Sequence, residues 1–527
     1  MTFGAFTDDN HYQLTTPQTV GAWWNYCFND HTHVTVGPDG SGKSIIREPN
    51  IQQWNRPFRW FYLRDRATGE VWCPAWAPMG SQLDSYTCTH GPVSTTISSS
   101  KAALNSDIRC YVPSEAQAET WTWTLSDTSG NDRQFDVFVI LGLDDKNFMG
   151  WNCFWDDEQN VFAKYAFPHH AHYDDYERLK TRPTHAAVAP TIDPTSWAGR
   201  LDDVTGGACA GIVPDAVAAG ILPSQVVSNG NPVAALHWRV DVPANSSWRV
   251  DWLATLVDST ADAAALRQQV AADATAVDAE LAKVTTKANE DEEQIVCDSP
   301  DADLNRIINR WMKKQITWQT RLWRNGISYP VRNILQDAVG YSLYAPTAAL
   351  EPMRTVTAMQ KQNGYVKVWT TRPGENADHP LVHKVHDDGG IWLAICCAAG
   401  LHAARDMTLL DEVIPYVDSG SATWYEHLLG ALRFYDTELG DHGLVLMRDG
   451  DWTDPINGPG RFGKGESGWA SMALAYACEQ VAVLADLKND STAATECRER
   501  AERHRQACDD HLWGGDHYAY GFDDDGL

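Results

Sequence analysis

The pattern of apolar residues changes once along this chain, and that change limits the folds the chain can adopt. Residues 1 to about 260 carry short runs in which apolar and polar residues alternate, separated by Gly, Asn, Asp and Pro: VTV, RWFYLR, TWTWTL, FDVFVIL and HWRVDV. Alternation with a period of two is typical of strands with one buried face. The first half of the chain therefore predicts a large antiparallel β-sandwich.

The second half has a helical pattern. An Ala-rich, charged stretch with little apolar face follows the strand-like half, and amphipathic segments separated by polar loops begin at about residue 301. Such segments predict helical hairpins that assemble into an (α/α)6-barrel-type domain. We therefore expect a β-sandwich domain at 1–260, a helical linker at 261–300 and the N-terminal part of an α/α barrel at 301–527.

Composition excludes several classes of partner. The net charge is −28, which argues against a nucleic-acid partner, since such a partner needs a basic face. The chain begins without a basic or apolar leader, and no apolar run is long enough to span a bilayer. The 12 cysteines are scattered with no CxxC pair, as expected for buried thiols in a reducing compartment. We expect a cytoplasmic protein with no membrane contact, and any anionic substrate would need a local cationic pocket.

Chemistry-bearing residues concentrate between residues 442 and 469, in HGLVLMRDGDWTDPINGPGRFGKGESGW. The glycines and prolines exclude a helix interior, so this stretch predicts a loop joining two helices. An Asp beside a Trp suits carbohydrate chemistry, because an indole stacks on a sugar ring and its apolar surface raises the carboxyl pKa. Asp454 is therefore the candidate general acid, and the 23 tryptophans of the chain also favour a sugar binder.

Two further motifs resemble ligand-binding sites, but the sequence favours a structural interpretation of each. Residues 37–44, GPDGSGKS, match the phosphate-binding pattern GxxxxGKS, but a nucleotide site needs a helix directly afterwards and none is predicted, so we expect a hairpin turn. The string FPHHAHYDDY contains metal-capable side chains, but such a cluster on an acidic loop is more often solvated or hydrogen-bonded than metal-bearing, so no metal is expected. Its metal-capable residues are His169, His170, His172, Asp174 and Asp175.

Several strings, in one order along the chain, resemble the phosphorylases of glycoside hydrolase family 94. They are FGAFTDDNHYQLTTPQTVGAWWNYCFND, RDRATGEVWCPAW, VRNILQDAVG, HDDGGIWL, LLDEVIPY, WYEHLLGAL, GDWTDPIN and GKGESGW. The resemblance covers nearly the whole chain. It implies inverting phosphorolysis of a β-linked glucosyl disaccharide to a sugar 1-phosphate and a free sugar, with inorganic phosphate as co-substrate and no cofactor. It also implies a homodimer.

The resemblance assigns roles to residues of the 442–469 loop. Asp454 matches the family's general acid, and one acid is enough because phosphate is already an anionic nucleophile. Asp451 is expected to be a supporting or capping carboxylate, with direct catalysis as the alternative. Trp452 matches a sugar-contacting residue, although it could equally anchor the loop. Lys464 and Glu466 are expected at the start of the next helix, with Glu466 in its first turn.

The resemblance also assigns substrate-binding roles elsewhere. Arg332 and Asp337 match a sugar- or phosphate-binding string, because an Arg fork and a carboxylate can each bind hydroxyls; a helix–helix salt bridge is the alternative. Gln336, Asp387 and Asp388 are weaker candidates, for which capping or structural roles are as compatible with the sequence.

The sequence departs from the family in three respects. Asn333 stands where the family usually has Asp, and Thr453 where it usually has Asn. The family's chain also continues beyond the counterpart of residue 527, where a His and a Ser or Thr contact phosphate. We therefore expect a fragment, a site completed by a second chain, or an inactive protein. An inverting hydrolase of the same fold and a non-catalytic carbohydrate-binding protein stay open as alternatives.

Overall fold

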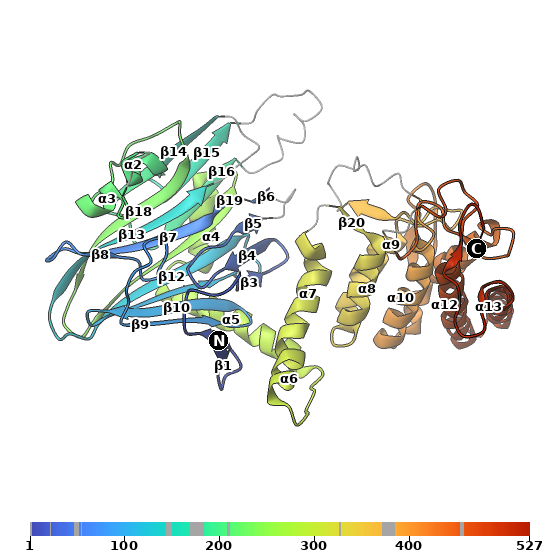
Figure 1. Ribbon diagram of the computed structural model, residues 1–527. Helices are drawn as coiled ribbons and strands as arrows, with labels where there is room; N and C mark the ends of the chain where they lie inside the picture. Colours follow the sequence, from blue (N-terminus) through green and yellow to red (C-terminus); the bar gives the residue numbers. More distant parts are fainter. Residues whose placement is uncertain are drawn as a thin grey trace. The chain divides into compact units, whose positions relative to one another are not determined.

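Antiparallel strands of the first half form two main stacked sheets and one small sheet (Figure 1). The computed structural model describes residues 3–21, 23–46, 52–53, 55–143, 150–167, 184–207, 211–325, 328–371, 385–453 and 458–526. In spatial order the large sheet contains β1 (Gly4–Phe6), β2 (Tyr12–Leu14), β9 (Ser85–His90), β10 (Ser94–Lys101), β11 (Leu104–Tyr111), β12 (Ala118–Asp127), β19 (Ser247–Val257), β16 (His185–Pro190), β15 (Val161–Phe167) and β14 (Gly150–Asp156). The second sheet contains β17 (Ser196–Arg200), β18 (Pro232–Val242), β13 (Arg133–Leu143), β7 (Asn55–Asp65) and β8 (Val71–Trp72). The small sheet contains β3 (Asn25–Phe28), β4 (Thr32–Val36), β5 (Ser44–Ile46) and β6 (Gln52–Gln53).

The core between the two main sheets follows from the alternation in the sequence. On β12, Trp121 and Trp123 are both fully buried in this core, because residues two apart on a strand point to the same face. Trp121 stacks on Trp252 of β19, with ring centroids 6.1 Å apart, and Phe61 of β7 reaches it from the second sheet at 5.7 Å. The predicted antiparallel sandwich is confirmed.

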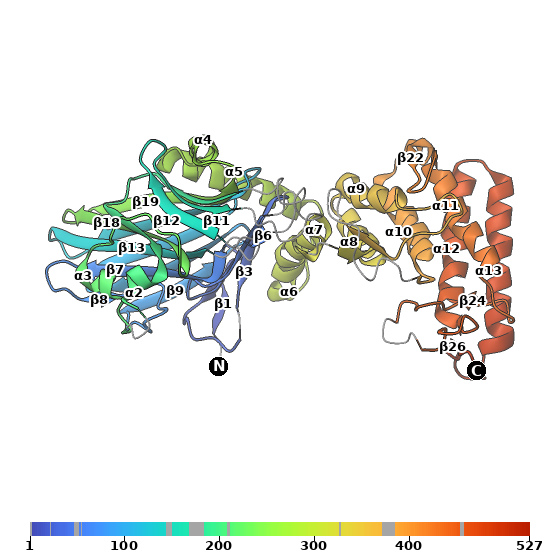
Figure 2. The ribbon, with the colours of Figure 1, turned by 90° about the horizontal axis from the view of Figure 1, so that it is seen from above.

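Helices cover the outer faces of both sheets. Short helices α2 (Leu201–Thr205) and α3 (Asp215–Ala219) pack on the second sheet through Val204 and Val217. On the large sheet lie α4 (Thr260–Val270) and α5 (Ala274–Glu293), as Figure 2 shows. Ala263 and Val277 of these helices are buried in the same cluster as Leu253 of β19. The stretch predicted as a linker thus packs on the sheet over part of its length.

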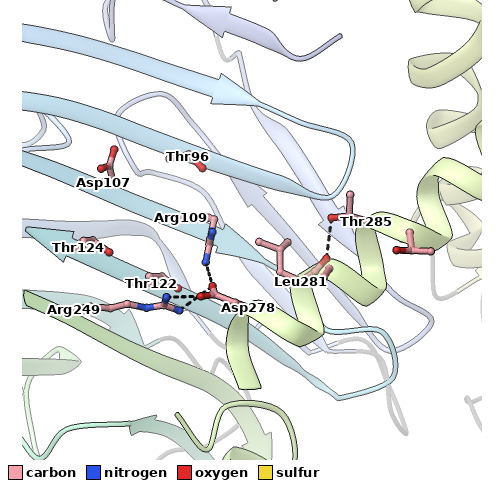
Figure 3. A pocket seen from close by; sticks show the side chains of 11 residues that line it. Thr96, Asp107, Arg109, Thr122, Thr124, Arg249, Asp278, Leu281 and Thr285 are labelled. Carbon is pink, nitrogen blue, oxygen red and sulfur yellow. Dashed lines mark hydrogen bonds and ion pairs between the residues drawn. The ribbon is translucent and has the colours of Figure 1, made fainter. Parts of the chain in front are cut away.

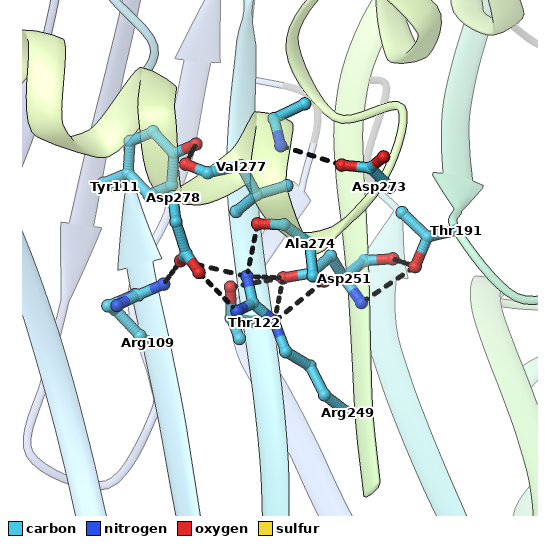
Figure 4. A network of polar contacts seen from close by, with 11 residues as sticks. Arg109, Tyr111, Thr122, Thr191, Arg249, Asp251, Asp273, Ala274, Val277 and Asp278 are labelled. Atoms are coloured by element: carbon cyan, nitrogen blue, oxygen red, sulfur yellow. Dashed lines mark hydrogen bonds and ion pairs between the residues drawn. The ribbon is translucent and has the colours of Figure 1, made fainter.

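Polar contacts fasten α5 to the sheet (Figure 4). Asp278 of α5 accepts hydrogen bonds from Arg109 at 2.8 Å and from Arg249 at 2.7 Å, and the Tyr111 hydroxyl donates to the backbone oxygen of Val277 at 2.9 Å. Arg249 also binds Asp251 on its own strand at 2.8 Å. Burial opposes the charge of Arg249, but Asp278 and Asp251 outweigh it and raise the pKa of the guanidinium.

The string GPDGSGKS forms the turn of an antiparallel hairpin. Strands β4 and β5 pair on either side of it, with His33 opposite Ile45. Strand β5 follows the turn directly, where a nucleotide-binding loop would lead into a helix, so the predicted hairpin is confirmed. The Ser44 hydroxyl is buried, donates to Glu119 and accepts from Arg59 at 2.8 Å.

By internal contacts the chain divides into two compact units, Met1–Glu292 with Asp298–Trp311 and Glu293–Cys297 with Met312–Leu527. The domain boundaries predicted at 260 and 300 stay predictions. Two short helical segments, α6 (Ala302–Arg306) and the π-helix η1 (Ile307–Met312), follow α5.

Helices of the second unit form two layers. Its described helices are α7 (Lys313–Leu322), α8 (Val331–Ser342), α9 (Pro346–Thr357), α10 (Gly389–Ala404), α11 (Trp424–Phe434), α12 (Gly468–Leu487) and α13 (Ser491–Leu512), with short 3-10 turns at Trp323–Asn325, Met407–Asp411 and Tyr435–Thr437. In one layer α10 contacts both α8 and α12, and in the other α9, α11 and α13 pack against these helices. Helix α10, GGIWLAICCAAGLHAA, is apolar on all sides because neighbours surround it.

Short strands join the loops of this unit. They are the pairs β20 (Ser328–Pro330) with β21 (Trp369–Thr371) and β22 (Val413–Pro415) with β23 (Ser421–Thr423), and the three-stranded set β24 (Val445–Leu446), β25 (Glu466–Ser467) and β26 (Gly521–Phe522). The last set joins both ends of the 442–469 loop to the segment after α13.

Helix α12 is long and apolar enough, by length and composition, to cross a membrane. No such run was expected from the sequence. More than half of the helix is buried, and it packs against α10 and α13. This is the environment of a core helix, which passes the same test of length and composition.

The described cysteines are free thiols, and all of them except Cys297 are buried. Burial raises the pKa of Cys73 in the first unit and of Cys397 in the second to about 12. At neutral pH these thiols are therefore protonated and unreactive.

Candidate active site

Three neighbouring helices begin close together, and two residues of the predicted site, Arg332 and Asp388, lie at these helix ends. Arg332 is the second residue of α8, Asp388 directly precedes α10, and Ser467 directly precedes α12. Because α8, α10 and α12 alternate along the chain with helices of the other layer, their N-terminal ends lie on the same side of the array. Ser467 caps α12 by accepting the Ala470 N–H at 3.0 Å.

Arg332 connects these helix ends to the 442–469 loop. Its Nη1 donates to Asp388 Oδ2 at 2.7 Å and to the backbone oxygen of Asp451 at 3.1 Å. The guanidinium carbon lies 5.3 Å from the ring centroid of Trp452, within the range of a cation–π contact. The side chain is 6% exposed and that of Asp388 is 2% exposed, so this ion pair is desolvated.

Two adjacent carboxyl groups are buried beside Arg332. Burial raises the pKa of Asp388, although Arg332 opposes the shift. Burial and the neighbouring Asp388 and Asp451 hold the pKa of Asp387 well above its ordinary value. Within the described residues the Asp387 carboxyl has no hydrogen-bond partner, while its backbone oxygen accepts from the Tyr435 hydroxyl. Asp387 is thus suited to holding a proton.

The Asp451 carboxylate is fully buried and surrounded by donors. Oδ1 accepts the Thr453 N–H at 2.8 Å, and Oδ2 accepts the Ser467 hydroxyl at 2.7 Å. The Tyr520 hydroxyl lies 2.6 Å from Oδ1 and 2.5 Å from Oδ2. Burial and the hydrogen bond to Asp451 raise the pKa of Tyr520, so its proton is retained. These surroundings suit a supporting carboxylate, the role predicted for Asp451.

Trp452 belongs to a cluster of three tryptophans. Its ring lies 5.3 Å from that of Trp392 on α10 and 6.3 Å from that of Trp469 on α12, nearly parallel to the latter at 22°. Trp452 is 40% exposed. An indole that rests on other rings and keeps one part open can offer a stacking surface to a sugar, and the sugar-contacting role of Trp452 stays a prediction.

The structure does not bring Arg332 and Asp337 together as one ion pair. Asp337 is instead held by Arg324, with Nη2 at 2.7 Å and Nε at 3.2 Å. Burial raises the pKa of Asp337, and Arg324 opposes that shift. Gln336 is half-buried beside it on α8. The substrate-binding roles of these residues stay predictions.

The predicted general acid, Asp454, lies outside the described residues, which stop at 453 and resume at 458. The predicted cluster at 169–175 also lies outside them. Among the residues that the structure describes, no three His, Cys, Asp or Glu side chains gather as a metal site.

The prediction for Glu466 was wrong in its local structure. Glu466 lies in β25, ahead of the cap of α12, and not in the first turn of the helix. Its side chain is buried, accepts the backbone N–H of His442 at 3.0 Å and contacts the His442 ring nitrogen at 2.5 Å. It therefore closes the base of the 442–469 loop.

A cavity of about 750 Å³ lies between α5 and the large sheet of the first unit (Figure 3). Thr122 and Thr124 line the sheet side, and Leu281 lines the helix side. Both of its arginines, Arg109 and Arg249, point to Asp278 and are bonded to it. Their charges are compensated, so this cavity is a poor candidate for binding phosphate.

Sequence reasoning missed several residues of the site. Trp392 and Trp469 stand in two strings that carry the family resemblance, HDDGGIWL and GKGESGW, which offered a signal for them. Tyr520 is separated from Asp451 by 69 positions, and nothing in the local pattern marks it.

Comparisons with known proteins agree with this architecture. Residues 10–273 match the family described as glycosyl hydrolase 94, supersandwich domain, and residues 289–527 match the glycosyl hydrolase 94 superfamily, catalytic domain. The chain is 34% identical to the 3-O-beta-D-glucopyranosyl-beta-D-glucuronide phosphorylase of Paenibacillus borealis, over 99% of this chain and 68% of that protein. It is 28% identical to the solabiose phosphorylase of the same organism, again over 99% of this chain and 68% of that protein.

A solved structure shows the same fold. A bacterial glucoamylase complexed with acarbose aligns with a TM-score of 0.54 and 10% identity, over 95% of this chain and 70% of that one. The second unit is accordingly part of an (α/α)6-type helical array. The family matches, the relatives and the order of the two units lead to one conclusion: this chain belongs to the glycosyl hydrolase 94 superfamily, together with these disaccharide phosphorylases.

Proposed function

We propose that this protein takes part in the inverting phosphorolysis of a β-linked glucosyl disaccharide to a sugar 1-phosphate and a free sugar. The supporting observation is that Arg332 joins Asp388, the Asp451 backbone and the Trp452 ring in one contact set. A fixed cation, buried carboxyl groups and an open indole provide the hydrogen bonds and the stacking surface that a sugar ring needs.

The proposed chemistry divides into two events at the glycosidic bond. A phosphate oxygen attacks the anomeric carbon on the face opposite the leaving sugar, and the bond from that carbon to the glycosidic oxygen breaks. Asp454 gives its proton to that oxygen, so the second sugar leaves as an alcohol. The phosphate anion needs no base, so a single acid is enough for this reaction.

The direct test is a panel of β-linked glucosyl disaccharides, incubated with the full chain in the presence and absence of phosphate. The β-glucosyl names of relatives motivate this panel. We expect sugar 1-phosphate to form only when phosphate is present. Sugar release that does not depend on phosphate would support an inverting hydrolase instead. Oligosaccharide binding without turnover would support a carbohydrate-binding protein and would refute catalysis by this chain.

The acid is tested by Asp454→Asn, which keeps the size of the side chain and removes the transferable proton. Cleavage of a disaccharide with a poor leaving group should fall about 100- to 10,000-fold, the usual contribution of a general acid. A substrate whose leaving group needs no proton should be affected much less. Asp451→Asn is the matched variant and should show no such dependence on the leaving group. The reverse pattern would assign the acid to Asp451.

We also propose that the protein is a homodimer, as the family resemblance implies. Sedimentation velocity over a wide concentration range should give one species of twice the chain mass. A monomer throughout that range would remove this proposal.

A further inference from the structure

The Asp451 side chain receives its donors from three separate segments. The Thr453 N–H comes from its own loop, the Ser467 hydroxyl from the cap of α12, and the Tyr520 hydroxyl from the residues before β26. Tyr520 contacts both carboxylate oxygens, at 2.6 and 2.5 Å. A carboxylate with donors on both oxygens has little freedom to rotate, so the backbone that carries it is held as well.

The backbone next to this side chain is held from the opposite side. The Asp451 carbonyl accepts from Arg332, and the same guanidinium lies over the ring of Trp452. The peptide at residues 451–453 is thus fixed through a side chain on one side and a carbonyl on the other. The direction in which the Trp452 indole leaves the backbone depends on both attachments.

The segment that carries Tyr520 makes a second attachment to the same loop. Asp524, two residues after β26, accepts three backbone N–H groups, from Phe462 at 2.8 Å, Lys464 at 2.9 Å and Gly465 at 3.1 Å. These backbone hydrogen bonds are among the causes that lower the pKa of Asp524, as expected for a carboxylate bonded in its charged form. Between these attachments, β26 pairs with β25 through Glu466 opposite Phe522.

We propose that residues 520–524 position two described parts of the 442–469 loop, with Tyr520 acting through Asp451 to place the Trp452 indole and Asp524 acting on the amides of Phe462, Lys464 and Gly465. Tyr520 and Asp524 are positioning residues, because each acts through another group and need not touch a substrate. The catalytic consequence rests on the proposed phosphorolysis, whereas the placement of Trp452 can be measured without any turnover.

The chain offers a matched pair of substitutions. Tyr520→Phe removes the hydroxyl bonded to buried Asp451. Tyr518→Phe removes a hydroxyl two residues earlier, which donates to the exposed Asp509 at 2.5 Å. Within the described residues this hydroxyl forms no hydrogen bond with the loop. Both variants lose one oxygen atom and keep the ring, so a difference between them reports the partner of the hydroxyl.

Fluorine NMR of protein labelled with 5-fluorotryptophan gives a readout specific to Trp452. Its resonance is identified among the 23 tryptophans by its loss in Trp452→Phe. Tyr520→Phe should shift or broaden this resonance and leave the signals of the sandwich tryptophans in place, and Tyr518→Phe should change neither. An unchanged Trp452 resonance in Tyr520→Phe would overturn the proposal. Changes spread over all tryptophans would also overturn it, since they would show a general structural role.

Hydrogen exchange tests the second attachment. In Asp524→Asn the amides of Phe462, Lys464 and Gly465 should exchange about 10- to 100-fold faster, the factor that corresponds to losing one hydrogen bond to a charged group. Peptides from α10 and α13 should keep their protection. Equal exchange in wild type and variant would show that Asp524 does not hold the loop.

The third test measures the phosphorolysis activity of the two tyrosine variants. If the wild type phosphorolyses a disaccharide, Tyr520→Phe should lower kcat/KM about 10-fold or more, and Tyr518→Phe should match the wild type; equal rates in both variants would contradict the catalytic consequence. A wild type without turnover refutes the proposed function, and the NMR and exchange results still decide the inference.

Discussion

The buried pair Arg332–Asp388 should respond asymmetrically to the loss of either partner. The atoms Nη1 and Oδ2 are 2.7 Å apart, and the two side chains are 6% and 2% exposed. In Asp388→Ala the guanidinium stays charged, because its pKa is too high for deprotonation. Removing one partner of a buried ion pair costs about 3–5 kcal/mol of stability. In Arg332→Met the group that loses its ion-pair partner is the Asp388 carboxyl, which can become neutral by taking a proton.

The sign of the pH dependence follows from the pKa of Asp388. Burial already raises this pKa above its unfolded value, with Arg332 opposing. Without Arg332 the pKa of Asp388 in the folded state rises further. At low pH the carboxyl is protonated, which removes the cost of a buried charge, and stability is lost as pH rises. For one proton the loss is about 1.4 kcal/mol per pH unit between the unfolded and the folded pKa. The stability that Arg332→Met loses relative to the wild type should therefore grow from pH 5 to pH 8. The stability that Asp388→Ala loses should not grow over this range.

Native-state hydrogen exchange of α10 peptides is the appropriate measurement, because a chain with two compact units need not unfold in one step. Asp486→Ala provides a control in the same unit. It removes an ion pair with Arg498 whose side chains are 48% and 54% exposed, and such exposed pairs contribute about 0–1 kcal/mol. If Arg332→Met lowers the opening free energy of α10 by the same amount at pH 5 and at pH 8, the reasoning is refuted.

Three other predictions concern the rest of the chain. Burial and the nearby Arg503 and Arg500 lower the pKa of His504 to about 4, so the folded state resists protonation of this ring and stability is lost as pH falls below the unfolded pKa. Between pH 8 and pH 5 the opening free energy of α13, measured by hydrogen exchange, should fall by about 2 kcal/mol more in the wild type than in His504→Gln. Asp278→Asn weakens the contacts of α5 with the sheet, so limited proteolysis should cut residues 274–293 faster, and an unchanged cutting rate would contradict the fastening role. Lys43→Ala should leave ATP titrations as flat as those of the wild type, since the GPDGSGKS turn is a hairpin; measurable ATP binding that disappears in the variant would show that a nucleotide site exists there.

Much of the fold could be predicted because local periodicity and tertiary packing agree. The string TWTWTL places its two tryptophans on one face of β12, and the core uses that face. The hairpin at residues 37–44 was predictable for a similar reason, since the following residues could not form a helix. The nearness of the starts of α8, α10 and α12 also follows from order along the chain, because alternate helices of a two-layer array run in the same direction.

The contacts within the site could not be predicted in the same way. Asp388 is 56 positions from Arg332, and no local pattern distinguishes it from Asp337 as the partner. Asp337 is taken by Arg324, whose backbone has a φ of 52°. A non-glycine residue with positive φ cannot be foreseen from its identity. Glu466 was predicted in a helix because acidic residues favour the first turn. In the structure its segment instead pairs as β25 with β24 and β26, and a local preference cannot reveal this long-range pairing.

The buried cysteines have a practical consequence for measuring how this protein opens. A protonated thiol inside a packed core does not react with an alkylating reagent, and it becomes reactive when its surroundings open. Cys73 and Cys110 report on the first unit, and Cys396 and Cys478 report on the second. Timed alkylation followed by peptide mass spectrometry would therefore give a separate opening rate for each unit of the unmodified chain. No label has to be introduced, and the two rates come from the same sample.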